Sequence, residues 1–278
     1  MKTFHKIADI QQQILEAKKQ GKTIGFVPTM GALHDGHLSL VRAARKENDL
    51  VVVSIFVNPI QFNNPEDLKK YPRTFETDAA MLDSEKCDYI FYPSVEEMYP
   101  DNEEVKNYDF GALENVMEGE FRPGHFNGVA VVVKKLFDIV PADHAYFGKK
   151  DFQQLAIIRK LVEIENIAIK IHAMETRREV DGLAMSSRNT RLTLEERKVA
   201  PEIFQVLNWV KNQKSDQSPQ ELMDGAKLKL QKNFQPEYFQ IVDGYSLQTI
   251  GDWTETKYPV ACVAAHLGEV RLIDNIEL

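Results

Sequence analysis

Cysteine is scarce in this sequence of 278 residues, which contains only Cys87 and Cys262. The two lie far apart and form no Cys-x-x-Cys pattern. This excludes a disulfide-dense scaffold and suits reduced thiols in a cytoplasm. We expect both side chains to serve as packing residues.

Long hydrophobic runs and an excess of positive charge are also absent. No apolar run approaches the roughly 18 residues of a membrane span, and the first residues, MKTFHKIADIQQQ, contain no apolar signal-peptide core. The net charge of -8 argues against a broad nucleic-acid footprint and against an anionic membrane surface. We therefore expect a cytoplasmic protein with no membrane or nucleic-acid partner. An anionic small molecule would need a local basic pocket.

The composition is that of a globular protein, with 43% hydrophobic and 27% charged residues and no internal repeat. In the first part of the chain, short buried runs alternate with helical patterns, which predicts an α/β fold with a parallel sheet. The expected strands are residues 22–27, 50–57, 88–92, 144–147 and 168–174. The expected helices follow residue 36 and cover residues 75–86, 129–140 and 151–163. Residues 100–109 are expected to form a surface loop and residues 119–128 a loop or turn-rich connection.

A smaller α+β domain is expected to follow, so that residues 1–176 and 177–278 form separate domains. Its expected helices are residues 194–211 and 219–232, and its expected strands are residues 237–242, 260–266 and 270–273.

The stretch FVPTMGALHDGHLSL, residues 26–40, reads as a strand, a turn and a helix, with Pro28 expected to end the strand. Such a corner leaves unpaired N–H groups and the positive end of the helix dipole facing the ligand crevice. The imidazoles of His34 and His37 fall in the turn and could donate to a polyphosphate.

The residues of this turn also allow other interpretations. Gly31 and Gly36 have the spacing of half a Walker A loop, but His37 and Leu38 stand where that loop needs its lysine and hydroxyl, so a P-loop is rejected. His34 and His37 could share a helix face around a metal, although no Glu or Cys lies at zincin-like spacing. On this motif alone, the sequence is also compatible with a turn whose histidines are merely solvated.

Polar residues follow two other expected strands. Asn58 and Gln61 come after residues 50–57, where ligands of open parallel sheets bind, although ordinary turn chemistry would also explain them. Gly148 to Asp151 repeats the strand-to-helix corner, with Asp151 as an expected helix N-cap. Two such corners could meet over one nucleotide. Alternatively, Lys149 and Lys150, which lie between Gly148 and Asp151, could form a solvated edge.

Two further groups are candidates. Of Gln153 and Gln154 in the first helical turn, one should face the crevice and the other solvent. Ser186, Ser187 and Arg188 combine hydroxyls with a guanidinium, which suits phosphate oxygens in a mobile loop. A linker between domains would explain the same segment.

Seven segments in order along nearly the whole chain resemble the pantoate:beta-alanine ligase (pantothenate synthetase) family of the HIGH-motif nucleotidyl-transfer superfamily. They are PTMGALHDGH, NPIQF, YPRT, RPGHFNGV, FGKKDFQQL, DGLAMSSRN and GEVRLIDN. The resemblance implies a Rossmann-like, doubly wound first domain and a C-terminal lid domain. It also implies a cytoplasmic homodimer in pantothenate biosynthesis.

The resemblance also implies site roles. His34, His37 and Lys150 would be catalytic, and Gln61 and Gln154 would bind (R)-pantoate, with beta-alanine adjoining Gln61. The implied ATP-binding residues are Met30, Gly31, Ala32, Leu33, His34, Asp35, Gly36, His37, Gly148, Lys149, Lys150, Asp151, Arg177, Met185, Ser186, Ser187 and Arg188. Residues 185–188 would correspond to a KMSKS-like loop. Mg²⁺ is expected with ATP, and its ligands are unknown.

The implied reaction joins pantoate and beta-alanine through a pantoyl adenylate and releases pyrophosphate and AMP. Three residues depart from the family pattern: Lys149 replaces a glutamate, Val131 a threonine and Arg177 an aliphatic residue. Three alternative functions are those of a nucleotidyltransferase of the same superfamily, an aminoacyl-tRNA synthetase and a non-catalytic ATP-binding regulator. The size and net charge of the chain disfavour the aminoacyl-tRNA synthetase.

Overall fold

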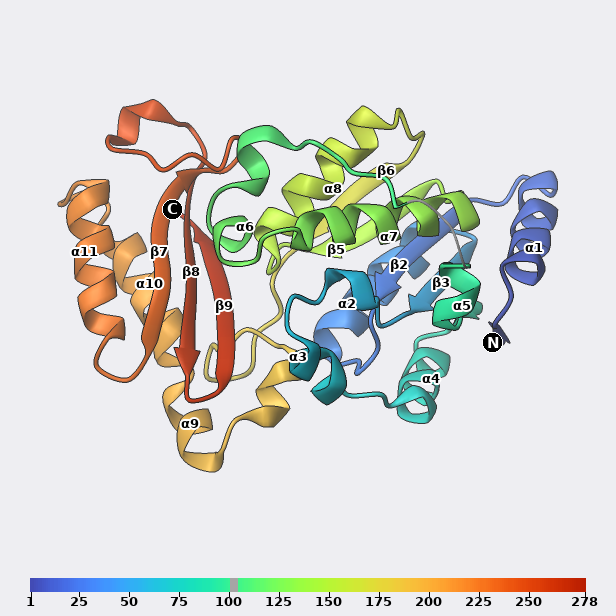
Figure 1. Ribbon diagram of the computed structural model, residues 1–278, viewed down its shortest axis with the longest axis horizontal. Helices are drawn as coiled ribbons and strands as arrows, with labels where there is room; N and C mark the ends of the chain where they lie inside the picture. Colours follow the sequence, from blue (N-terminus) through green and yellow to red (C-terminus); the bar gives the residue numbers. More distant parts are fainter. Residues whose placement is uncertain (101–104) are drawn as a thin grey trace. The chain divides into compact units, whose positions relative to one another are not determined.

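The computed structural model describes residues 1–100 and 105–278 (Figure 1). They form two compact units, each of which is discontinuous in sequence. The first comprises Met1–Asp109, Pro123–Lys149 and Ile157–Glu175, and the second comprises Phe110–Arg122, Lys150–Ala156 and Thr176–Leu278. A functional division at residues 176 and 177 stays a prediction.

The first unit contains a six-stranded sheet in the order β1-β4-β3-β2-β5-β6. All of its strand pairs are parallel. Its strands are β1 (Lys2–Phe4), β2 (Ile24–Thr29), β3 (Leu50–Ile55), β4 (Tyr89–Phe91), β5 (His144–Gly148) and β6 (Lys170–Met174). The expected α/β fold class is confirmed.

The strand order reverses direction between β2 and β5, because β3 and β4 lie on one side of β2 while β5 and β6 lie on the other. Gly25 pairs with His144 and Phe26 with Ala145, so the register places Gly148 level with Thr29. Ligands of open parallel sheets bind at such a switch point, beyond the carboxyl ends of the strands. The two corners singled out in the sequence therefore follow adjacent strands.

Helices cover both faces of this sheet. Val27 and Tyr146 pack with Leu40, Val41 and Ala44 of helix α2 (Asp35–Glu47) on one face. Side chains alternate along a strand, so Phe26 and Phe147 point the other way, where both rings contact Phe137 of helix α7 (His125–Ile139). The helices of the described residues are α1 (Ile7–Lys19), α2 (Asp35–Glu47), α3 (Pro65–Lys70), α4 (Phe75–Ser84), α5 (Val95–Met98), α6 (Glu118–Phe121), α7 (His125–Ile139), α8 (Phe152–Ile164), α9 (Leu194–Val199), α10 (Glu202–Gln213) and α11 (Pro219–Leu230).

The second unit is built on a three-stranded antiparallel sheet of β7 (Gln235–Asp243), β8 (Pro259–Leu267) and β9 (Val270–Glu277). Helices α10 and α11 pack on one face, against Phe239 and Val263 (Figure 1). Tyr238 and Cys262 point to the other face, where Met117 and Phe152 cover them. This second layer explains why residues 110–122 and 150–156 belong to the C-terminal unit.

Three local expectations are wrong. Pro28 does not end its strand, because β2 continues to Thr29. At Pro28 the strand pairs with β3 but no longer with β5, whose pairing with β2 ends at Phe26. The missing N–H of Pro28 is therefore not needed on the side that faces β5. Residues 194–211 form two helices, because Pro201 has no N–H to continue the first. Residues 119–128 are not all loop, since α6 and the start of α7 fall within them. Residues 101–104 of the expected loop 100–109 lie outside the described residues.

Both cysteines are free and buried, as expected. Burial raises the pKa of the Cys87 thiol to about 12. Among the described residues, no helix is both long enough and apolar enough to cross a membrane.

Candidate active site

The turn between β2 and α2 is held by a buried carboxylate. Asp78 is 1% exposed and accepts from the backbone N–H groups of Ala32 and Leu33 at 2.9 and 2.8 Å. Gly31 and Ala32 both have positive φ, 80° and 50°. A β-carbon on Gly31 would lie 3.0 Å from Asp78 Oδ2, so this left-handed position also lacks space for a side chain. The carboxylate therefore fixes a strained turn in one conformation.

The two histidines of the turn cap helix α2 reciprocally. His34 is the N-cap and its Nδ1 accepts from the N–H of Gly36 at 3.2 Å, while Nδ1 of His37 accepts from the N–H of His34 at 3.3 Å. A nitrogen that accepts carries no proton, so both rings are held with the proton on Nε2. Their centroids are 4.1 Å apart. The start of α2 thus holds both imidazoles through their Nδ1 atoms.

Gln61 lies in a buried amide network. Its Oε1 accepts from Asn58 Nδ2 at 3.1 Å, and its backbone oxygen is bonded to His125 Nδ1 at 2.8 Å. Asn58 also donates to the carbonyl of Gly128 and accepts from Tyr99. The Gln61 Nε2 group donates to the Met30 thioether at 3.1 Å. Sulfur is a weak acceptor, so a ligand oxygen could replace it at little cost.

The second corner is fixed by the backbone. Gly148 ends β5, and the next N–H, that of Lys149, donates to the carbonyl of Met174 at 2.8 Å. The Lys149 ammonium lies 2.5 Å from Glu175, whose side chain is 81% exposed. Lys149 is thus paired at the rim of the sheet.

Lys150 and Asp151 belong to the second unit. The Lys150 carbonyl accepts from Asn275 Nδ2 at 2.9 Å, and its side chain is 18% exposed with Nζ 3.9 Å from Asp151. Asp151 directly precedes α8, and its carbonyl accepts from the N–H of Leu155. Asn275 thus orients the backbone from which the Lys150 ammonium projects.

The segment from Arg177 to Arg188 folds as a tight hairpin followed by a 3₁₀ turn. The N–H of Met185 donates to the carbonyl of Arg177 at 2.9 Å, which brings two of the predicted ATP-binding residues together. Arg178 pairs with Ala184 and donates both terminal nitrogens to Asp274 at 2.6 and 2.9 Å. Ser186 then caps the 3₁₀ turn by accepting from the N–H of Arg188. Arg178 therefore anchors the base of the predicted phosphate loop to β9.

Three guanidinium groups gather near this loop. Burial, together with the positive charges of Arg271 and Arg188, lowers the pKa of Arg122. The Glu118 carboxylate acts in the opposite direction but does not outweigh them. Arg271 donates to both oxygens of Glu118 at 2.8 and 2.7 Å. The carboxylates of Glu118 and Glu237 offset part of this positive charge, and the remainder would suit an anionic ligand.

The expectation that one of the two glutamines of α8 faces solvent is wrong, because neither side chain is exposed. Gln153 is 3% exposed, donates to the carbonyls of Leu113 and Val116 and accepts from the N–H of Glu118. It is a structural clamp for the segment ahead of α6. Gln154 is half-buried and carries none of these bonds.

A family model described as pantoate-beta-alanine ligase matches residues 2–277 of the chain. The chain belongs to the pantoate-beta-alanine ligase family. The pantothenate synthetases of Porphyromonas gingivalis W83 and Azobacteroides pseudotrichonymphae are 49% and 50% identical to it over 279 residues, covering 99% or more of each chain.

Solved structures agree with this assignment. Pantothenate synthetase from Thermus thermophilus has a TM-score of 0.94 at 40% identity, covering 100% of this chain and 99% of that one. Pantoate-beta-alanine ligase from Francisella tularensis, solved in complex with beta-gamma ATP and beta-alanine, has a TM-score of 0.83 at 36% identity and covers 100% of this chain and 97% of that one. The predicted family and enzyme class are confirmed, whereas the roles of individual residues stay predictions.

Several supporting residues were not singled out in the sequence. Arg122 and Arg271 lie inside two of the family segments, RPGHFNGV and GEVRLIDN, so a signal for them was present. Asp78 and Gln153 act on backbone groups that are distant in sequence, and nothing local marks them.

Proposed function

We propose that this ligase activates (R)-pantoate with ATP and then transfers the pantoyl group to beta-alanine. A pantoate carboxylate oxygen attacks the α-phosphorus and pyrophosphate leaves. The amine of beta-alanine then attacks the acyl carbon, AMP leaves with the bridging oxygen, and the amine loses a proton to give pantothenate. The observation that carries this proposal is family membership over residues 2–277, together with the Francisella tularensis relative that was solved with beta-gamma ATP and beta-alanine.

The first step needs donors for phosphate oxygens rather than a protein nucleophile. Negative charge builds on the oxygens around the α-phosphorus, and preorganised donors stabilise it without reorganising. The Nε2–H groups of His34 and His37 are fixed by their caps, which supports this role. Lys150 is assigned to the transferring phosphoryl group, and Asn275 positions its backbone.

The ATP site is proposed to include the loop that ends in Ser186, Ser187 and Arg188. Its hydroxyls and guanidinium would bind the triphosphate, and the neighbouring charge of Arg122 supports that assignment. Adenine would contact the backbone at Arg177, whose carbonyl already bonds to the N–H of Met185. The side chain of Arg177 is exposed, so its departure from the family pattern leaves this backbone contact available.

Pantoate is assigned to neutral amides. Gln61 and Gln154 can orient the carboxylate and hydroxyls without neutralising the attacking oxygen, which a lysine or arginine would do. The buried network from Asn58 and His125 holds Gln61 in place, and its weak bond to Met30 can be exchanged for a substrate oxygen.

Mg²⁺ is proposed to accompany ATP. This ion keeps most of its coordination shell as water and substrate phosphate oxygens, so few protein carboxylates are required. Asp35 is ion-paired with Arg42 at 2.5 Å, and Asp151 lies 3.9 Å from Lys150, so the acidic residues of both corners already face cations. We therefore assign Mg²⁺ to the phosphates and to no particular side chain.

The family resemblance further supports a cytoplasmic homodimer. Light scattering of the purified chain would give a mass of about twice the 31.8 kDa of one chain if it dimerises.

The proposed function is tested by incubating the chain with ATP, Mg²⁺ and each substrate in turn. AMP and pyrophosphate should accumulate when pantoate and beta-alanine are both present, together with pantothenate. ATP and beta-alanine without pantoate should give neither product. Formation of ADP and phosphate would contradict adenylate chemistry.

A further inference from the structure

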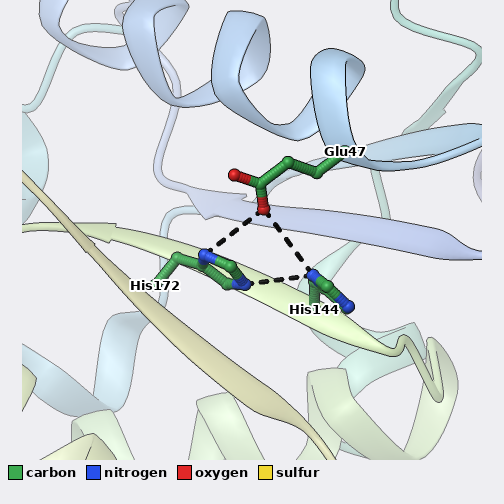
Figure 2. Close-up of side chains that lie close together, drawn as sticks. All are labelled: Glu47, His144 and His172. Atoms are coloured by element: carbon green, nitrogen blue, oxygen red, sulfur yellow. Dashed lines mark hydrogen bonds and ion pairs between the residues drawn. The ribbon is translucent and has the colours of Figure 1, made fainter.

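A second group of ligand-type side chains lies in the first unit, away from the carboxyl ends of the strands. Glu47 is the last residue of α2, His144 is the first of β5 and His172 lies within β6. Figure 2 shows the three side chains lying close together, each within reach of the other two. Glu47 Oε2 is 3.8 Å from His144 Nδ1 and 3.4 Å from His172 Nδ1, and His144 Nδ1 is 3.0 Å from His172 Nε2.

The sheet register brings these residues together. His144 pairs with Lys170, and Tyr146 pairs with His172, so the three aromatic side chains project from one face of β5 and β6. The His172 ring stacks on Tyr146 at 4.5 Å and on His144 at 4.9 Å between centroids. β5 then runs about 13 Å from His144 to Gly148. The cluster therefore lies at the opposite end of the strand from the proposed nucleotide residue.

The carboxylate is oriented by buried partners. The Tyr146 hydroxyl donates to Glu47 Oε2 at 2.9 Å and itself accepts from Asn48 Nδ2 at 2.8 Å. Tyr146 and Asn48 are 0% and 7% exposed. Asn48 is fixed in turn by its bond to the carbonyl of Ala44. A hydrogen-bonded outer shell of this kind is typical of metal ligands, because it sets the direction and basicity of the ligand atom.

We propose that Glu47, His144 and His172 bind a divalent transition-metal ion, with Zn²⁺ as the best match. Two imidazoles and one carboxylate are a common donor set for zinc, and ligand atoms about 2.0–2.1 Å from a tetrahedral ion lie about 3.3 Å apart. Glu47 Oε2 lies 3.8 Å from Nδ1 of His144 and 3.4 Å from Nδ1 of His172, and the three residues offer one ligand atom each within 4.8 Å of one another. Modest shifts of these side chains would therefore place all three around one ion. The Glu47 side chain is 49% exposed, which leaves access for the ion and for a water at the fourth position.

The bound ion would link the end of α2 to β5 and β6. Because its ligands lie outside the predicted catalytic groups, its expected effect is on stability. Binding to the folded state alone raises the free energy of unfolding by mass action, so the melting temperature should increase with metal concentration.

The test uses the chelator-treated full chain, titrated with Zn²⁺ by calorimetry and with Co²⁺ by visible absorption. One equivalent should bind, and Co²⁺ should give the intense bands of a tetrahedral site. His144→Gln and Glu47→Gln change partly exposed side chains and should weaken Zn²⁺ binding by at least about tenfold. Tyr146→Phe keeps the ring and should weaken binding less than either ligand substitution.

The matched control is His5→Ala, which removes an exposed imidazole elsewhere in the chain and should leave Zn²⁺ affinity unchanged. Absence of saturable binding, or equal binding by the parent chain and His144→Gln, would overturn the proposal and leave a hydrogen-bonded histidine pair. Loss of binding in the His5 variant would also overturn it.

Discussion

The backbone N–H of His34 donates to Nδ1 of His37 across 3.3 Å, so one histidine holds the other as an acceptor on that nitrogen. Because Nδ1 of His34 is likewise occupied, by the N–H of Gly36, both imidazoles have their proton on Nε2. The capping of α2 and the proposed donation to phosphate therefore depend on the same two side chains. A substitution here should affect stability and rate to different extents.

His37→Ala should lower kcat for AMP formation by on the order of 10²-fold, the usual effect of losing one preorganised donor. Loss of its capping bond should cost only about 1 kcal/mol of unfolding free energy. Steady-state kinetics and urea denaturation on the same preparation separate the two effects, with His5→Ala as the control. Near-normal turnover in a folded His37→Ala protein would mean that the turn has no catalytic part.

The adjacent lysines 149 and 150 offer a matched pair. Lys150→Ala should lower kcat by on the order of 10²-fold, since it removes a cation assigned to the transferring phosphoryl group. Lys149 is paired with an exposed carboxylate, so Lys149→Ala should change kcat by less than about fivefold. Equal losses in the two variants would show that general positive charge, rather than Lys150 itself, serves the reaction.

The adjacent glutamines separate substrate binding from folding. Gln154→Ala should raise the KM for pantoate by about tenfold or more with little change in the KM for ATP, as expected for a lost substrate hydrogen bond. Gln153→Ala should instead cost at least about 2 kcal/mol of unfolding free energy, because it removes the buried amide that bonds to backbone groups of Leu113, Val116 and Glu118. If Gln154→Ala shifts both KM values equally, the pantoate pocket is misassigned.

Acid stability should depend on Glu118. Burial alone would raise the pKa of this carboxyl, but the hydrogen bonds and charge of Arg271 outweigh it and hold the pKa below its usual value. A lowered folded-state pKa gives stability that is present above the unfolded pKa of about 4.3 and is lost as the pH falls through the lower, folded value.

Glu118→Gln should therefore lower the free energy of unfolding at pH 7 by about 3 kcal/mol and flatten its fall below about pH 4.3. Arg271 keeps its ion pair with Glu237, so part of the acid dependence should survive. Urea denaturation at a series of pH values measures this. An unchanged pH profile in the variant would show that the Glu118–Arg271 pair has no net linkage to folding.

The sequence predicted those features that depend on neighbouring residues. The strand-to-helix corners at residues 30–37 and 148–151 follow from local periodicity and glycine placement, and both are found. The three-residue strand β1 was not predicted, because its only support is pairing with β4, far along the chain. A helical pattern also could not reveal whether Pro201 would interrupt it.

The same distinction holds for the site. His34 and His37 were visible as a motif, since their capping partners lie within three residues. Asp78 acts on a turn 46 residues away, and Asn275 acts on Lys150 across 125 residues. Clamps of this kind come into place only when the units fold, so no local pattern marks them.

Isotope transfer from pantoate to AMP tests the central claim most directly. The reaction would use pantoate carrying the heavy oxygen isotope in its carboxylate, with ATP, Mg²⁺ and beta-alanine, and the products would be weighed by mass spectrometry. Attack on the α-phosphorus predicts one labelled oxygen in each AMP and one retained in pantothenate. Unlabelled AMP, or label in inorganic phosphate alongside ADP, would contradict the pantoyl adenylate.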